Sequence, residues 1–521
     1  MRIEPALQAP PDGPSVLWPP GVPPTSEAPG LEACRADLHL DPVIDAVLGD
    51  DRDDRDELRA HFHVLLRDPD DVAYRHEVYR DLADPVLRTA VDAFARALRR
   101  LGGLGRWTPQ ARRPRRSQRL HLDAASLYVS AVHALCDAFT GRPPSARALR
   151  AIEAHLREHV ASVAFRALDH DVRTLEQELD AIAYGLTILD DRVHVRRAFD
   201  RSDYAADIER TFHRFRRTDA PQALPERFEL TEMSDVEAAV LDLVARHHPT
   251  TFAALEVFAQ RHTAFVDRVC ERFGAEVRFY LAYLAFTERL APLGSTFCLP
   301  DVGTGTEVEA LDVFDVALAE SLREEGGQVV PNDVRLAAGE RVLVVTGANQ
   351  GGKSTFARAF GQLHYLAALG CPVPARVARL PLRDTLLTHF ERDEDLRTLQ
   401  GRLGEELVRL GALLERLGPR SVVVMNEAFA STASDDALAL GRATIQRILD
   451  ADALGLVVTF TDELASCDPR VASVVATVDP SDPARRTYRL ERRAADGHAH
   501  AVAVAQAHGL TYEALRRRLR T

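Results

Sequence analysis

The sequence of 521 residues contains a single lysine, Lys353, although lysine and arginine together number 65. It also lacks net positive charge: its formal net charge is −13, so no global basic field indicates nucleic-acid binding. No uninterrupted apolar run approaches the ~18 residues of a membrane-spanning helix, and no basic segment followed by an apolar run marks a secretory signal. The expectation is a cytoplasmic protein without a membrane partner.

Cysteine is scarce and scattered. The six cysteines form no C-x-x-C pair and no metal-ligand spacing. This pattern is typical of reduced thiols in the cytoplasm and excludes a disulfide-stabilised secreted scaffold.

The length exceeds one ordinary hydrophobic core, so more than one domain is expected. Residues 1–30 are rich in proline and have little to bury, which predicts a disordered leader. Residues 31–290 show mostly helical periodicity, with a predicted β-hairpin near 186–196. From about residue 291 to 521, short β-branched runs alternate with amphipathic helices, which predicts an α/β domain.

Three short apolar runs in the second half predict buried parallel strands. They occupy residues 342–346, 421–425 and 456–459. Strands of this kind are covered by helices on both faces, and ligands bind beyond their carboxyl ends.

The single lysine lies in a phosphate-binding motif. Residues 347–354 read G-x-x-x-x-G-K-S, directly after the first predicted strand and at the start of a predicted helix. The glycines let backbone N–H groups converge on phosphates, Lys353 neutralises them, and the Ser354 hydroxyl is a ligand for Mg²⁺. The motif predicts an ATP site with Mg²⁺. Its candidate nucleotide contacts are Gly347, Ala348, Asn349, Gln350, Gly351, Gly352, Lys353, Ser354 and Thr355.

A polar pair ends the second predicted strand. Asn426 stands where such sheets usually carry an aspartate metal ligand, and its amide oxygen can still hold a metal-bound water. Glu427 follows it and is suited to polarise the water that attacks the γ-phosphate. The sequence therefore predicts Glu427 as the catalytic residue and Asn426 and Ser354 as the residues that hold the metal.

Several segments resemble the MutS family of DNA mismatch-repair ATPases. The phosphate loop is close to that family's TGPNMGGKST-F form, which is far more specific than a generic phosphate loop. The likeness is strong over roughly 300–521 and weak over 33–290. The segments that carry it are 74–82, 330–336, 346–356, 395–407, 425–438 and 501–515.

The resemblance implies an α/β P-loop (ABC-type) ATPase domain preceded by a mostly α-helical core/lever domain. It also implies a homodimer through the ATPase domain, with a C-terminal helix-turn-helix as a dimerisation segment and DNA as a partner. Gly401 occupies the place of the family's signature serine, which reaches the partner's nucleotide.

The chain also departs from the family pattern. Besides Asn426, the serine hydroxyl is missing at Gly401, and Phe460 stands where the family places a γ-phosphate-sensing histidine. These changes favour good ATP binding with slow or partner-stimulated hydrolysis. The family's mismatch-reading module has no counterpart before residue 74, so mismatch recognition by this chain alone is not expected.

Two functions remain open. The first is a dimeric ATP-dependent switch that acts on DNA, in mismatch repair or a related transaction, or on a DNA-repair protein partner. The second is a nucleotide-gated dimeric scaffold with little hydrolysis, which binds a protein partner instead of DNA. Helical levers and local arginine runs favour the first, whereas the net charge favours the second.

Overall fold

The computed structural model describes residues 13–22, 30–49, 52–103, 114–189, 192–197, 235–391, 402–430, 432–479, 481–495 and 516. The chain forms two compact units. Unit 1 comprises residues 1–88, 144–152 and 275–521, and unit 2 comprises 89–143 and 153–274. The units thus divide the chain differently from the predicted boundary near residue 290, which stays a prediction.

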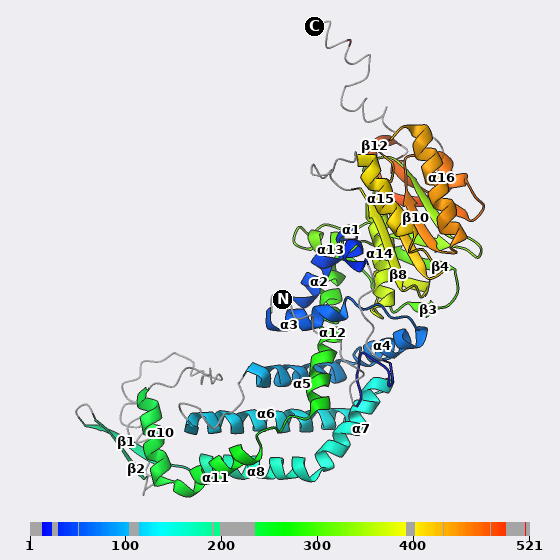
Figure 1. Ribbon diagram of the computed structural model, residues 1–521. Coiled ribbons are helices and arrows are strands. Elements are labelled where there is room, and N and C mark those ends of the chain that lie inside the picture. The colour runs from blue at the N-terminus through cyan, green and yellow to red at the C-terminus, as the bar shows by residue number, and fades with distance from the viewer. Residues whose placement is uncertain are drawn as a thin grey trace. The chain divides into compact units, whose positions relative to one another are not determined.

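The largest sheet of unit 1 has six strands in the order β12-β11-β6-β10-β9-β8 (Figure 1). The strands from β8 to β11 pair in parallel, and β12 pairs antiparallel with β11 at the edge. Their bounds are β6 (Val342–Gly347), β8 (Thr385–Phe390), β9 (Ser421–Asn426), β10 (Leu454–Val458), β11 (Val471–Asp479) and β12 (Asp482–Arg492).

The central strands β6, β9 and β10 are buried along almost their whole length because helices lie on both faces of the sheet. α14 (Lys353–Ala368) packs against β9 and β10. α15 (Arg402–Leu414) and α16 (Ser434–Asp450) share a core with alternate residues of β6 and β9. The three apolar runs identified in the sequence therefore form the centre of a mixed α/β unit.

A second sheet of unit 1 has four strands in the order β3-β7-β4-β5. Its β4 ends at a tight connection to α13, where Asp315 caps the helix by accepting hydrogen bonds from the amides of Ala317 and Leu318. The bounds are β3 (Asp301–Gly303), β4 (Val308–Val313), α13 (Val316–Arg323), β5 (Asn332–Leu336) and β7 (Val377–Pro381).

The remaining elements of unit 1 are short helices. Four lie before residue 88, and two 3₁₀ turns lie further along the chain. They are α1 (Leu31–Asp37), α2 (Leu40–Leu48), α3 (Arg52–His61), α4 (Pro69–Asp81), the 3₁₀ turn Ala291–Leu293 and the 3₁₀ turn Asp462–Ser466.

Residues 15–18 are buried in unit 1. The Glu276 carboxylate accepts a hydrogen bond from the Ser15 hydroxyl at 2.8 Å. The fully buried Arg75 guanidinium lies 4.9 Å from the centre of the Trp18 ring. For these residues the prediction of a disordered leader is wrong, because a short apolar run between the prolines finds a polar anchor and a cation–π partner that composition cannot reveal.

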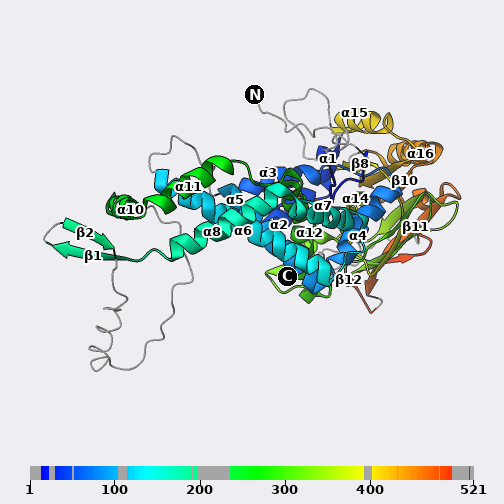
Figure 2. The ribbon, with the colours of Figure 1, turned by 90° about the horizontal axis from the view of Figure 1, so that it is seen from below.

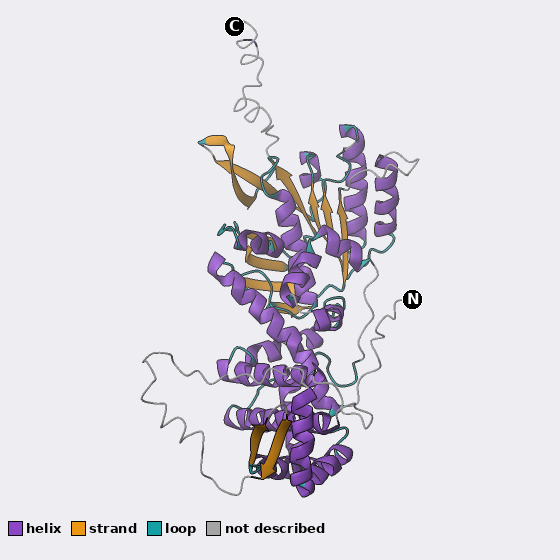
Figure 3. Cartoon of the chain, turned by 90° about the vertical axis from the view of Figure 1, so that its left-hand side faces the viewer, coloured by secondary structure: helices purple, strands orange, loops and turns teal. Residues whose placement is uncertain are grey.

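The described part of unit 2 consists of helices and a β-hairpin (Figure 3). In the hairpin β1 pairs antiparallel with β2, with Leu189 opposite Arg192, at the place where the sequence predicts a hairpin (Figure 2). The bounds are α6 (Pro114–Gly141), α8 (Val163–Asp180), β1 (Tyr184–Leu189), β2 (Arg192–Arg197), α10 (Asp235–His247) and α11 (Pro249–Arg261).

Three further helices contain a boundary between the units. They are α5 (Pro85–Gly103), α7 (Arg147–Ala161) and α12 (Arg268–Leu290). Within the described ranges, no helix has the length and apolar character needed to cross a bilayer.

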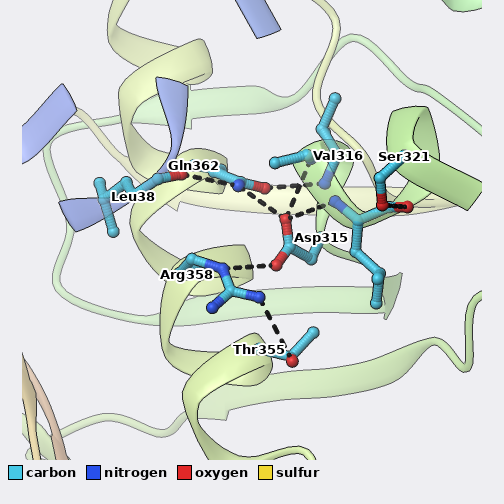
Figure 4. A network of polar contacts seen from close by, with 9 residues as sticks. Leu38, Asp315, Val316, Ser321, Thr355, Arg358 and Gln362 are labelled. Atoms are coloured by element: carbon cyan, nitrogen blue, oxygen red, sulfur yellow. Dashed lines mark hydrogen bonds and ion pairs between the residues drawn. The ribbon is translucent and has the colours of Figure 1, made fainter. Parts of the chain in front are cut away.

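A buried polar network joins α14 to neighbouring segments of unit 1 (Figure 4). Asp315, whose side chain is fully buried, accepts hydrogen bonds from Arg358 Nε and Gln362 Nε2, both at 2.8 Å. Gln362 Nε2 also donates to the carbonyl of Leu38 at 3.0 Å, and its Oε1 accepts the Val316 amide at 2.8 Å. The network fixes α14, and with it the loop that precedes α14.

Replacing Asp315 with alanine is expected to lower the free energy of unfolding by about 3–5 kcal/mol, because it leaves the Arg358 charge without its buried partner and removes the cap of α13. Urea denaturation followed by circular dichroism measures this change. The control is Asp301→Asn, which alters an exposed ion pair and should stay within about 0.5 kcal/mol of the wild type. Equal stability of the two variants would contradict the role given to the network.

Candidate nucleotide-binding site

A glycine loop, residues 347–352, connects β6 to α14 at the carboxyl edge of the main sheet. Gly347 has φ 105°, and a Cβ at this position would lie 2.7 Å from the carbonyl oxygen of Ala476 on β11. Gly352, with φ 91°, is the N-cap of α14. Residues with side chains rarely adopt such angles, so the loop needs glycine at both positions.

Lys353 is folded onto the glycine loop. Its side chain is only 4% exposed, and Nζ donates to the carbonyl oxygens of Gly347 at 2.8 Å and Ala348 at 3.2 Å. Nζ also lies 4.6 Å from the centre of the Phe460 ring. Burial lowers the pKa of the Lys353 ammonium, and the Glu427 carboxylate opposes that shift. A buried cation therefore lies against the glycine loop, and a cation beside the backbone amides of such a loop attracts phosphate.

The polar pair at the end of β9 lies at the same edge of the sheet. Asn426 is 9% exposed, and no residue in the described part of the chain forms a hydrogen bond with its Oδ1. Glu427 has φ 56°, and its amide donates to the carbonyl of Val458 on β10 at 3.0 Å. A left-handed, non-glycine conformation is strained and recurs at functional turns. Here it turns the chain away from the strand at the residue predicted to be catalytic.

A cavity of about 470 Å³ opens beside the loop. Its lining combines polar groups of the loop and Glu427 with a set of apolar side chains from residues 313–330, among which Asp315 and Gln328 are polar. Cavities with an apolar wall and a few convergent polar groups are typical of small-molecule sites. The apolar wall consists of Val313, Phe314, Leu318, Leu322, Val329 and Val330.

Tyr488 of β12 also lines this cavity. It has φ 57° and is 51% exposed, and its carbonyl accepts a hydrogen bond from Asn332 Nδ2 at 3.0 Å. Two residues earlier on the strand, Arg486 Nε donates to the carbonyl of Asn349 at 2.9 Å. The edge strand is thus tied to the glycine loop and brings an aromatic ring to the cavity.

Most of the residues predicted from the sequence meet in this region. Gln350, Gly352, Lys353, Ser354, Thr355 and Glu427 line the cavity, while Gly347, Ala348, Asn349 and Gly351 form the adjoining backbone of the loop. Gly401 and the predicted helix-turn-helix at 501–515 lie outside the described residues. The nucleotide-binding and catalytic roles of all these residues stay predictions.

Tyr488 and the apolar wall are not among the residues predicted from the sequence. Only Val330 of the wall belongs to a segment, residues 330–336, that resembles the family. Tyr488 gave no signal, because it reaches the cavity only through the pairing of β12 with β11.

The residues present fit a magnesium ion that is held through few protein ligands. Asn426 Oδ1 is buried and has no hydrogen-bond partner among the described residues, and Ser354 lines the cavity next to Lys353. Mg²⁺ prefers oxygen ligands and usually keeps several waters together with substrate phosphates. Among the described residues no cluster of three or more His, Cys, Asp or Glu side chains is arranged for a metal.

The fold and the site define a mixed α/β domain with a glycine-loop cavity at the carboxyl edge of its sheet. Residues 343–517 match the family model described as MutS domain V, which is the ATPase domain of the MutS family. The match begins inside β6 and includes the glycine loop and the Asn426–Glu427 pair. The resemblance to the MutS family predicted from the sequence is confirmed over this part of the chain.

Curated relatives agree with this family. The chain is 30% identical over 253 residues to the DNA mismatch repair protein MutS of Caulobacter sp. (strain K31), which covers 48% of the chain and 28% of the relative. It is 33% identical over 227 residues to MutS of Symbiobacterium thermophilum, an alignment that covers 43% of the chain and 25% of the relative. It is 29% identical over 213 residues to the DNA mismatch repair protein msh3 of Botryotinia fuckeliana, which covers 39% of the chain and 18% of the relative. The chain thus spans about a quarter of the length of the relatives named MutS.

Proposed function

We propose that this chain is a MutS-like switch of the P-loop (ABC-type) class, which binds and hydrolyses ATP, dimerises through its ATPase domain and acts on DNA in mismatch repair or a related transaction. The observation that carries the proposal is the buried Lys353 held over the glycine loop, in one cavity with Glu427. The relatives named DNA mismatch repair proteins support the DNA part.

In the proposed mechanism, Lys353 leaves the carbonyl oxygens of the loop and pairs with the β- and γ-phosphates of ATP. The amides of the loop and the N-terminus of α14 bind the phosphate oxygens. Glu427 orients the attacking water and accepts its proton. Ser354 and Asn426 would hold a Mg²⁺ ion, Asn426 through a water, and the ion would supply positive charge that neutralises the phosphates.

Tyr488 and the apolar wall are suited to hold the adenine base. Tyr488→Ala is expected to weaken ATP affinity by about ten- to hundredfold, because base–aromatic stacking is worth about 1–3 kcal/mol. Affinity for inorganic tripolyphosphate should not change. Calorimetric titration with both ligands measures this, with Tyr184→Ala in the hairpin of unit 2 as the matched control. An equal loss for tripolyphosphate would show that Tyr488 supports the loop instead of the base.

Hydrolysis is expected to be slow or to depend on a partner. Phe460 lies against Lys353 and cannot donate a hydrogen bond to a phosphate. Asn426 offers a neutral oxygen where a carboxylate would attract Mg²⁺ more strongly. The site keeps the groups that bind a nucleotide and lacks two that speed its hydrolysis.

These same two residues favour a second candidate function, a nucleotide-gated dimeric scaffold that hydrolyses little and binds a protein partner. The net charge of −13 favours it as well. The two functions differ in their need for DNA phosphate contacts.

Binding of labelled duplex, branched and single-stranded DNA, measured by fluorescence anisotropy over a salt series, separates the two candidates. A DNA-acting switch should bind at low salt and lose affinity as salt rises, because each phosphate contact releases counterions. The titrations are repeated with ATP and with Lys353→Ala, which should remove only the nucleotide effect. If none of these DNAs binds at low salt, the DNA part of the proposal fails and the scaffold takes its place.

A further inference from the structure

The turn after β9, which carries Glu427, is strained at two places. Glu427 has φ 56° and Phe429 has φ 64°, and neither is glycine. Residues with side chains keep such angles only when the surrounding structure holds them. The groups that hold the turn therefore also set the direction in which the Glu427 carboxylate points.

Among the described residues, three contacts attach this turn to other elements of the unit. The Glu427 amide donates to the carbonyl of Val458 at 3.0 Å. The Phe429 side chain is 3% exposed and belongs to the core shared by α15 and α16. The Phe429 amide donates to Oε1 of Glu406 at 2.9 Å, in a buried hydrogen bond between residues 23 positions apart. Of the three, only the last depends on a polar side chain.

Glu406 lies in the first half of α15 and is 8% exposed. The same Oε1 atom lies 3.3 Å from Nε2 of His389 on β8, which is 5% exposed. Burial lowers the pKa of His389, and the Glu406 carboxylate opposes that shift. A buried carboxylate is costly unless it is hydrogen-bonded, so these two partners account for its presence in an otherwise apolar core.

We propose that Glu406 is a positioning residue for Glu427. By accepting the Phe429 amide, it fixes the strained turn that aims the Glu427 carboxylate into the cavity, and His389 holds the Glu406 carboxylate in place. The proposal rests on the function proposed above, in which Glu427 polarises the attacking water. Glu406 does not line the cavity, so it acts on hydrolysis and not on nucleotide binding.

Two conservative variants distinguish the effect of the acceptor oxygen of Glu406 from the effect of its negative charge. Glu406→Gln keeps an acceptor oxygen at the same reach, whereas Glu406→Asp keeps the charge but is one methylene shorter. We expect the aspartate variant to lower the single-turnover rate of ATP hydrolysis by about ten- to hundredfold, since small misplacements of catalytic groups have effects of this size. The glutamine variant should stay within about threefold of the wild type. ATP affinity should be unchanged in both.

The control is Glu415→Asp, just beyond the end of α15, where the side chain is exposed. Amide hydrogen exchange of residues 426–430 is measured alongside turnover and should be faster in Glu406→Asp only. The exchange rate of the turn is compared with the rates of strands β6 and β10 in the same sample. A general loss of stability would raise all of these rates, whereas loosening of the turn would raise its own rate alone.

The outcomes distinguish this proposal from the function on which it rests. Wild-type turnover that Glu427→Gln abolishes and Glu406→Asp leaves unchanged overturns the role of Glu406 alone. A glutamine variant as slow as the aspartate variant also overturns it, because the charge would then matter and not the reach. A wild type that binds ATP without turnover, and that Glu427→Gln does not change, overturns both.

Discussion

Replacing Glu427 with glutamine is expected to lower the rate of ATP hydrolysis by about 10²- to 10⁴-fold, the usual contribution of a general base. ATP affinity should stay within about twofold, because the phosphates are bound by the glycine loop and Lys353. Glutamine keeps the shape of the side chain and preserves the turn at φ 56°. Single-turnover hydrolysis with radiolabelled ATP, beside equilibrium binding of the same nucleotide, measures the two quantities separately.

The matched control for this experiment is Glu463→Gln, an exposed carboxylate in the 3₁₀ turn Asp462–Ser466 that does not line the cavity. It should leave both quantities unchanged. A Glu427→Gln variant that hydrolyses ATP as fast as the wild type would show that another group polarises the water, and the assignment of Glu427 would fail.

Lys353→Ala is expected to weaken ATP binding by about 10²- to 10⁴-fold. Two charge-assisted hydrogen bonds to phosphate are worth about 1.5–3 kcal/mol each, and every 1.4 kcal/mol is about tenfold in affinity. Lys353→Arg should fail to restore binding, because the position is 4% exposed and a planar guanidinium is wider than an ammonium. Calorimetric titration of both variants measures this.

Arg447→Ala is a suitable control, because this arginine is exposed in the last turn of α16 and does not line the cavity. It should bind ATP nearly as well as the wild type. Full ATP affinity in Lys353→Ala would contradict the site, because the lysine is the only cationic side chain among the described residues that line the cavity.

The sequence predicts the centre of the α/β unit well, for a local reason. Continuous apolar runs at 342–346 and 421–425 can be satisfied only by strands buried on both faces, and the structure has β6 and β9 there. The glycine loop is equally local, because its conformation follows from the glycines themselves. The Asn426–Glu427 pair is predicted from its place at the end of the second run, which forms β9, and β10 separates this strand from β6.

Features that depend on contacts between distant segments escaped the sequence. Tyr488 reaches the cavity because β12 pairs at the edge of the sheet, and no local pattern marks that pairing. Burial of residues 15–18 depends on Glu276, which lies far along the chain. The bond from Phe429 to Glu406 likewise joins a turn to a helix whose own periodicity indicates only core packing. In each case the contacting residue is far away in the sequence, and only the folded chain brings the two residues together.

Equilibrium ATP binding and steady-state ATP turnover, measured on the same wild-type sample with and without duplex and branched DNA, test the central claim most directly. Lys353→Ala serves as the blank. We expect the wild type to bind ATP far more tightly than Lys353→Ala does, and to hydrolyse it slowly, at a rate that DNA increases. A wild type that binds ATP no better than Lys353→Ala would contradict it.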